Sequence, residues 1–224
     1  MENPVLSVLG QVLPLAVGVA LSPLPVIAVV LVAMSPRARA SGPAFVAGRM
    51  LGLAAVLAII IAAADLLYSI ANAAQLPAVV KLVLGVALLV LGITKWRPKP
   101  KGAEPALPGW METFTTIAPG RAFGMAALMS AINPKEVALL LAVGLTIGGS
   151  QLTVPQEALV GVGVVVVASL TVAVPVIAVL AAPKRVGPVL DRLREWLTAN
   201  SSIVMGLLLV VIGAVVAGGA ISEL

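Results

Sequence analysis

Long apolar runs separated by short polar connections are the main pattern of this chain. A bilayer core is spanned by about 20 helical residues, and six apolar segments of the chain are at least that long. They cover residues 4–34, 43–67, 76–96, 120–149, 154–181 and 200–220. The pattern therefore predicts an all-α polytopic membrane protein with six transmembrane helices.

The fourth segment is interrupted in its middle, at Asn133 and Pro134. Asn favours the N-cap of a helix and Pro favours the first helical position, so this pair indicates a helix that ends and starts again. Glu136 follows the cap by three residues, which is the spacing of a capping box. We expect a broken helix near mid-membrane, and we include Pro134 in the candidate substrate site because unpaired amides face the ligand at such breaks.

The first segment contains a similar interruption, in which Ser22 is the expected cap and Pro23 and Pro25 follow it. Neither proline has an amide hydrogen to donate, so both suit the first turn of a restarted helix. Pro134 follows Pro23 by 111 residues, about half of the chain. This spacing predicts an internal repeat with one broken helix in each half, and we include Pro23 and Pro25 in the candidate substrate site.

Basic residues are concentrated in alternate connections between the apolar segments. Of the 14 Lys and Arg residues, 11 lie in the first, third and fifth connections, and the second and fourth connections contain none. The positive-inside rule then makes the odd connections cytoplasmic and places both termini outside. Each half has three spans, so the second half enters the membrane in the opposite direction. This is the plan of two inverted three-helix repeats found in secondary transporters.

These boundaries divide the chain into three parts. Residues 1–96 form the first three-helix repeat, residues 97–119 a proline-rich cytoplasmic linker, and residues 120–224 the second repeat. Near 188–199, apolar and charged residues alternate at helical spacing, which predicts an interfacial amphipathic helix on the inner leaflet. Its expected apolar face consists of Val189, Leu190, Leu193, Trp196 and Leu197.

The composition argues against most classes of enzyme. The chain is 61% hydrophobic and only 10% charged, whereas about a quarter of the residues of a soluble domain are charged. It has no Cys and no His, which excludes disulfides, thiolate nucleophiles, the usual zinc sites and imidazole acid–base chemistry. We therefore expect no enzyme activity, no cofactor and no metal. The membrane topology accounts for the basic residues without a nucleic-acid partner.

Polar side chains inside the spans are the candidate site. Ser22 and Asn133 are expected either to cap the broken helices only or also to contact the substrate. Lys135 and Glu136 lie near mid-membrane, where a charge is costly and usually functional. We expect Lys135 to interact with another carboxylate, a backbone carbonyl or an anionic substrate, and we include it in the candidate substrate site. Glu136 either closes the capping box or carries a coupling proton, and we expect the second role. Arg49 either extends to the cytoplasmic edge or lines the site.

At these motifs the chain resembles the lysine exporter (LysE) superfamily, whose members carry Ser-Pro in the first span and Asn-Pro-Lys in the fourth. Within it, residues 20–29, 35–40 and 130–135 resemble the GAP family of glycopeptidolipid- and sulfolipid-addressing proteins. The resemblance covers essentially the whole chain. Amino-acid exporters of the superfamily continue the first motif with Gly and later a polar residue, where this chain has the apolar Leu24 and Val26.

Together these features predict a transporter or exporter of the bacterial inner (plasma) membrane that works by alternating access. The resemblance implies that its substrate is an envelope lipid or another amphipathic anion, with membrane lipids as its partners. Two alternatives remain open: an accessory protein that serves a separate lipid exporter, and an amino-acid exporter of the LysE type. Whether the chain forms a homodimer is also left open by the sequence.

Overall fold

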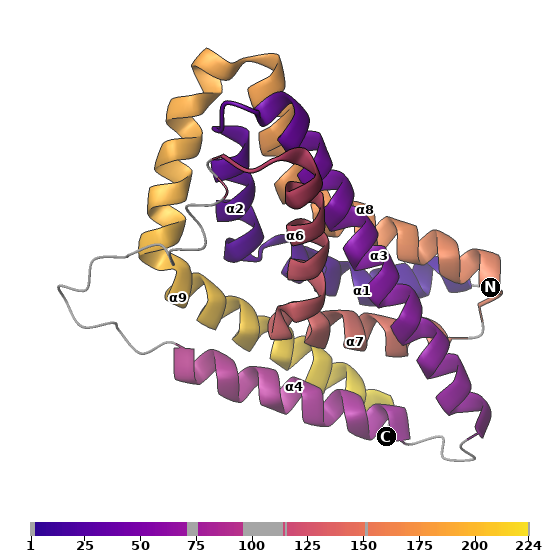
Figure 1. Cartoon of the computed structure of the whole chain (residues 1–224). Coiled ribbons are helices and arrows are strands. Elements are labelled where there is room, and N and C mark those ends of the chain that lie inside the picture. Colours follow the sequence, from indigo (N-terminus) through magenta and orange to yellow (C-terminus); the bar gives the residue numbers. More distant parts are fainter. Residues whose placement is uncertain (1–2, 71–75, 96–113, 115, 151, 224) are drawn as a thin grey trace.

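A computed structural model of the chain describes residues 3–70, 76–95, 114, 116–150 and 152–223, and all regular structure in these residues is helical. Most of the predicted linker, 97–119, lies outside the described residues. The helices are α1 (Pro4–Ala20), α2 (Pro23–Ala33), α3 (Ala38–Ile70), α4 (Leu76–Lys95), α6 (Pro119–Ile132), α7 (Pro134–Gly148), α8 (Val154–Ala181) and α9 (Pro183–Glu223) (Figure 1).

The helices agree with the predicted spans. α3, α4, α8 and α9 are each long and apolar enough to cross a membrane. α1 and α2 meet at a bend of 53°, and α6 and α7 at a bend of 69°, so each pair forms one broken span or a re-entrant segment. The described residues therefore contain four to six candidate spans. The prediction of an all-helical, multi-pass membrane protein with breaks in the first and fourth segments is confirmed.

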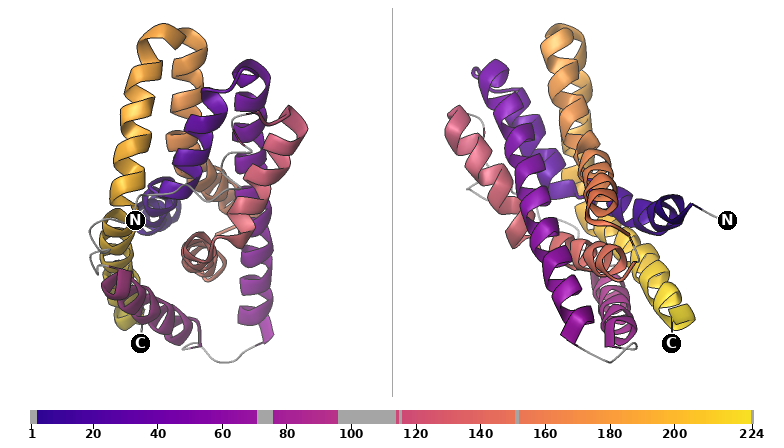
Figure 2. Two further views of the ribbon diagram at one scale, coloured as in Figure 1. Left: turned by 60° about the vertical axis from the view of Figure 1, so that its left-hand side comes forward. Right: turned by 90° about the vertical axis from the view of Figure 1, so that its right-hand side faces the viewer.

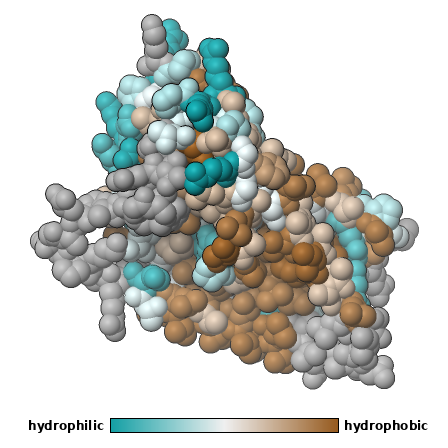
Figure 3. Space-filling model, in the orientation of Figure 1, coloured by the Kyte–Doolittle hydropathy of each residue, from teal (hydrophilic) through white to brown (hydrophobic). Residues whose placement is uncertain are grey.

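Helix ends and turns mark two ends of the molecule. The turns that join α2 to α3 and α8 to α9 lie at the upper end in Figure 1, whereas the N-terminal end of α1, the C-terminal end of α7 and the N-terminal end of α8 lie toward the right. The upper end has a hydrophilic surface, and the body below it is mainly hydrophobic (Figure 3). Which end faces the cytoplasm stays a prediction, as does the outward orientation of the termini.

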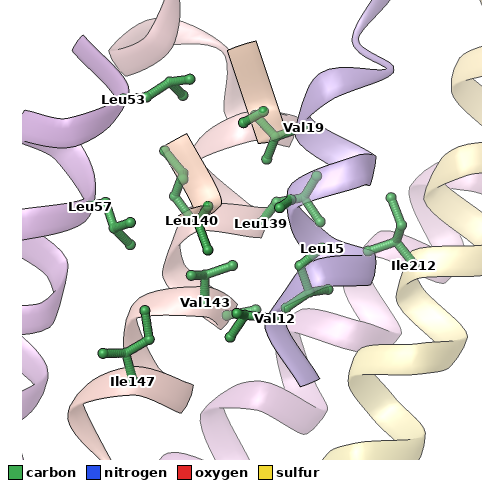
Figure 4. Packing of buried hydrophobic residues seen from close by; sticks show 14 of the residues in the cluster. Val12, Leu15, Val19, Leu53, Leu57, Leu139, Leu140, Val143, Ile147 and Ile212 are labelled. Atoms are coloured by element: carbon green, nitrogen blue, oxygen red, sulfur yellow. The ribbon is translucent and has the colours of Figure 1, made fainter. Parts of the chain in front are cut away.

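α7 is the central helix of the bundle, with the other helices arranged around it (Figure 2, left). Leu139, Leu140, Val143 and Ile147 are all fully buried, so this helix is apolar and covered on several sides. They pack against α1, α3 and α9 in the main core (Figure 4). Because lipid is as apolar as these side chains, close packing rather than removal from water holds such helices together.

Glycines bring α3 and α6 unusually close together. A Cβ atom added at Gly48 would lie 2.1 Å from the carbonyl oxygen of Phe123, and one added at Gly52 would lie 2.6 Å from that of Ala127. Only residues without a Cβ fit at such a helix contact. The contact matters for the site because Arg49 directly follows Gly48 and is therefore held against α6.

The predicted interfacial helix near 188–199 is not an element of its own, because α9 runs without interruption over Pro183–Glu223 and changes direction between its upper and lower parts (Figure 1). Its apolar face is also divided. Leu190 and Leu197 are buried against the core that contains α2, whereas Val189 and Trp196 are 60% and 55% exposed. The sequence pattern detected the amphipathic turn but could not show that α2 covers half of it.

Candidate functional site

The two proline breaks meet in space. The side-chain amide of Asn133 donates a hydrogen bond to Ser22 Oγ at 3.3 Å, although these residues are 111 positions apart in sequence. Both residues have extended backbones, with φ and ψ of −75° and 114° at Ser22 and −71° and 106° at Asn133. In each case a proline occupies the next position and starts the following helix. The two breaks predicted from the sequence therefore lie against each other in the folded chain.

The capping arrangement differs from the prediction. Ser22 and Asn133 occupy the N-cap positions of α2 and α7, but neither side chain bonds to the helix amides that follow. The prediction of a capping box at Glu136 is wrong, because Glu136 Oε1 accepts a hydrogen bond from the side-chain amide of Asn133 at 3.2 Å instead. The other oxygen of the same carboxylate pairs with Arg49. The first amides of α7 thus have no capping side chain, and the helix end keeps its positive partial charge.

Arg49 and Glu136 form a buried ion pair between α3 and α7. Arg49 Nη1 lies 2.5 Å from Glu136 Oε2, and the two side chains are 1% and 0% exposed. The same nitrogen donates to Ser130 Oγ on α6 at 3.2 Å, and Ser130 Oγ in turn bonds to the carbonyl of Ala126. Arg49 thus points inward to the second half of the chain rather than outward to a membrane edge.

Lys135 is a buried cation at the start of α7. Its side chain is 6% exposed, and its Nζ has no hydrogen-bond partner among the residues that the structure describes. The charges of Glu136 and Arg49 both act on it, so the three groups share one region. An ammonium that is removed from solvent and left unpaired is costly unless a further group neutralises it.

We call Ser22, Arg49, Ser130, Asn133, Lys135 and Glu136 the break cluster. It contains two cations and one carboxylate, which leaves one net positive charge within a buried region. Arg49 Nε is a second buried donor without a partner in the described residues. With the uncapped N-terminal amides of α7, the cluster can therefore accept one anionic group of a ligand.

The three prolines of the predicted site differ in their surroundings. Pro23 and Pro25 are buried, so they shape the first break and have little surface for a ligand. Pro134 is exposed on the outside of the second break. Together with Asn133, it lines an open apolar groove.

Two hydroxyl groups have roles that the sequence reasoning did not assign. Ser130 connects Arg49 to α6, as described above. Thr171 on α8 donates to the carbonyl oxygen of Ala20 at 2.5 Å, and this carbonyl belongs to the last residue of α1, where the helix has no partner for it. A serine placed three residues before the Asn-Pro pair is a sequence signal for the first role, whereas no signal in the sequence indicates the second.

Comparison with known proteins gives one family. The family model described as Sap, sulfolipid-1-addressing protein, matches residues 12–222. This range contains both helix breaks and every residue of the break cluster. Neither the curated proteins nor the solved structures include a significant match to the chain.

Proposed function

Because the chain belongs to the sulfolipid-1-addressing protein (Sap) family, we propose that it moves an anionic lipid across the bacterial inner membrane. The family assignment confirms the sulfolipid-addressing part of the sequence resemblance, and it ties this multi-pass membrane protein to sulfolipid addressing. Membership of the wider LysE superfamily stays a prediction.

The observation that carries the proposal is the unpaired, buried ammonium of Lys135. A monoanionic headgroup at this position balances the one net positive charge of the break cluster and makes the loaded site electrically neutral. It also accepts hydrogen bonds from Lys135 Nζ and from the first amides of α7, both of which are otherwise unsatisfied in an apolar environment. A sulfate, phosphate or carboxylate headgroup meets these requirements.

The surroundings of the cluster favour a lipid over a free amino acid. The residues that follow Lys135 on α7 are mainly apolar, and Leu139 and Leu140 have no exposed surface. An amino acid carries an ammonium as well as a carboxylate, and the net positive cluster offers its ammonium no free carboxylate, because Glu136 is paired with Arg49. A lipid needs only its headgroup held, and its chains remain in apolar surroundings.

Alternating access between two inverted repeats is the mechanism we propose for this movement. In an exchange of the two halves, α1–α4 correspond to α6–α9 in order. The observed packing of α3 on α6 then corresponds to the packing of α8 on α1, which is also observed. The α4–α9 and α3–α8 pairs are each their own counterpart. The hydrogen bond between Asn133 and Ser22 and the ion pair between Arg49 and Glu136 both join the two halves. In this mechanism these contacts rearrange as the halves rock.

The orientation that this mechanism requires can be tested directly, because the chain has no Cys. Ala38 and Gly187 line the same depression at one end of the molecule, and Ser150 follows α7 at the other end. We expect cysteines introduced at 38 and 187 to react with an impermeant maleimide from the cytoplasmic side and a cysteine at 150 from outside. Reversed labelling would contradict the proposed orientation.

Glu136 is the proposed coupling residue. Its protonation would break the ion pair with Arg49 and release a second cation toward the anion, so proton binding and anion binding favour each other. The variant Glu136→Gln cannot take up this proton, and we expect its remaining transport to be independent of a proton gradient. Unchanged gradient dependence in this variant would remove Glu136 from the coupling mechanism.

An accessory protein that delivers cargo to a separate exporter is the second candidate, and the word "addressing" in the family name favours it. Purified protein in liposomes separates the two. A transporter moves a fluorescent anionic lipid between leaflets without a second protein, and it moves a zwitterionic lipid with the same chains much more slowly. An accessory protein binds the anionic lipid without moving it.

A further inference from the structure

An open groove of about 380 Å³ begins at the second helix break and runs along α6 on the side that faces α9. This volume falls in the range of small-molecule sites, which is roughly 300–1,000 Å³. Except for Asn133, the lining is apolar and consists of Leu24, Met125, Leu128, Met129, Ile132, Pro134 and Met205. Leu128 and Ile132 are 56% and 65% exposed, so the groove opens sideways toward the surrounding lipid.

The groove borders the break cluster at Asn133. This residue lines the groove, and its side-chain amide bonds to Ser22 and Glu136 inside the cluster. Lys135 is the next residue but one after Asn133 in the same first turn of α7, and its side chain is buried. A molecule with an anionic group at Lys135 and an apolar chain therefore finds both environments side by side.

A second groove of about 490 Å³ lies between α3 and α8 and provides an internal comparison. It is also open and apolar, but its one charged lining residue is Glu157, whose side chain is 9% exposed. A carboxylate repels an anionic headgroup, whereas the α6 groove adjoins a cluster with a net positive charge. Charge complementarity thus distinguishes the two grooves, although the α3–α8 groove is larger.

We propose that the groove along α6 is the lateral entry and acyl-chain site for the anionic lipid whose headgroup binds at Lys135. This inference rests on the proposed function. Met125, Met129 and Met205 suit the role, because methionine side chains are flexible and polarisable and adapt to chains of different length. The lipid enters from the bilayer with its chain in the groove and its headgroup passing Asn133 to reach Lys135.

Photo-crosslinking in nanodiscs tests this site. The probe is a phosphatidylglycerol with a diazirine on one acyl chain, and the control probe is a phosphatidylcholine with the same chain. We expect the anionic probe to label residues of the α6 groove, and labelling there to fall at least about tenfold in Lys135→Met, in line with loss of a charge-assisted contact. Labelling in the α3–α8 groove should not favour the anionic probe, and it should be unaffected by this variant. Equal labelling of both grooves, regardless of Lys135, would overturn the proposal.

A matched pair of tryptophan variants provides the functional test. Ile132→Trp fills the α6 groove, and Leu51→Trp fills the α3–α8 groove from a position of similar exposure, 60% against 65%. We expect Ile132→Trp to slow movement of the anionic lipid about tenfold or more and Leu51→Trp to leave it within about twofold, given the cost of overfilling a site. Normal transport in Ile132→Trp would refute the groove and leave the proposed function standing. Absence of anionic-lipid binding in the unaltered protein would refute the proposed function itself.

Discussion

The two helix breaks have the same backbone and different chemistry. Each has an extended residue at the N-cap, a proline at the first helical position, and no side chain that caps the following helix. The bends are comparable, at 53° and 69°. These shared features are what an internal repeat of a broken helix predicts.

The side chains around the breaks differ strongly. After Ser22, the first break continues with Pro23, Leu24 and Pro25 and is almost entirely buried. The second break continues from Asn133 with a cation and a carboxylate, and its outer side opens to an apolar groove. The first half adds only Ser22 and Arg49 to the break cluster.

This difference indicates that the two breaks have different roles. In the proposed function, the first break is an apolar counterpart against which the second can be positioned, and the second holds the groups that would recognise a ligand. The predicted inverted repeat therefore does not require chemically equivalent groups in its two halves. Variants of single residues test this division of roles.

Breaking the ion pair between the halves should have the largest effect. Arg49→Met leaves Glu136 as a buried, unpaired carboxylate, and Glu136→Gln leaves Arg49 as a buried, unpaired guanidinium. We expect each to lower the free energy of unfolding by about 3–5 kcal/mol, while Arg49→Met combined with Glu136→Leu recovers most of the loss. Denaturation in detergent micelles, followed by circular dichroism, measures both. Single variants that lose less than about 1 kcal/mol, the worth of a surface pair, would contradict the buried pairing.

Removing the cation of the second break should weaken recognition and spare the fold. In Lys135→Met an unpaired buried charge is replaced by an apolar side chain of similar length, so stability should be unchanged or higher. Affinity for an anionic lipid should fall by about 1.5–3 kcal/mol, the worth of a hydrogen bond to a charged group. Lys135→Arg keeps the charge and serves as the control. Equal affinities of Lys135→Met and Lys135→Arg, measured by microscale thermophoresis, would oppose this role.

Forcing α3 away from α6 should destabilise the protein and displace Arg49 of the break cluster, although the substituted residue lies outside that cluster. The Cβ of Gly48→Ala would meet the carbonyl of Phe123, and we expect a loss of about 1–3 kcal/mol in the free energy of unfolding from this overpacking. Gly124→Ala on α6 is the matched control, because a Cβ there has no neighbour within 4 Å. Equal stabilities of the two variants would show that the close approach is not needed.

Removal of the hydrogen bond between Ser22 and Asn133 should have the smallest effect on the free energy of unfolding. Ser22→Ala and Asn133→Ala each remove the 3.3 Å hydrogen bond, and their interaction energy in a double-mutant cycle should be about 0.5–1.5 kcal/mol. Asn133→Ala alone should cost more than Ser22→Ala, because Asn133 also donates to Glu136. A coupling energy of zero in thermal unfolding would mean that the two breaks do not support each other through this contact.

Most of the fold could be predicted from the sequence, because bilayer thickness fixes the length of a span and proline fixes where a helix can restart. The predicted segments and the two breaks agree with the helices to within a few residues, apart from the longer α9. That the breaks meet at Ser22 and Asn133 is consistent with the repeat, although inversion of the halves stays a prediction.

The partners of the charged residues could not be predicted. Local spacing placed Glu136 in a capping box, but its carboxylate pairs with Arg49, a residue 87 positions earlier. Such a pairing depends on the close approach of α3 and α6, which is a property of the folded bundle. For the same reason, the contacts of Leu190 and Leu197 with α2 could not be predicted. The sequence alone indicated an apolar face on the membrane surface.

The most direct test of the account is the dependence of lipid binding on headgroup charge at Lys135. Native mass spectrometry of the purified protein with phosphatidylglycerol and phosphatidylcholine of identical chains, for the unaltered protein and for Lys135→Met, measures this dependence. The account predicts that the unaltered protein prefers the anionic lipid by at least about tenfold, equivalent to 1.4 kcal/mol, and that the preference disappears in Lys135→Met. An equal preference in both proteins would contradict an anionic headgroup site at the second break.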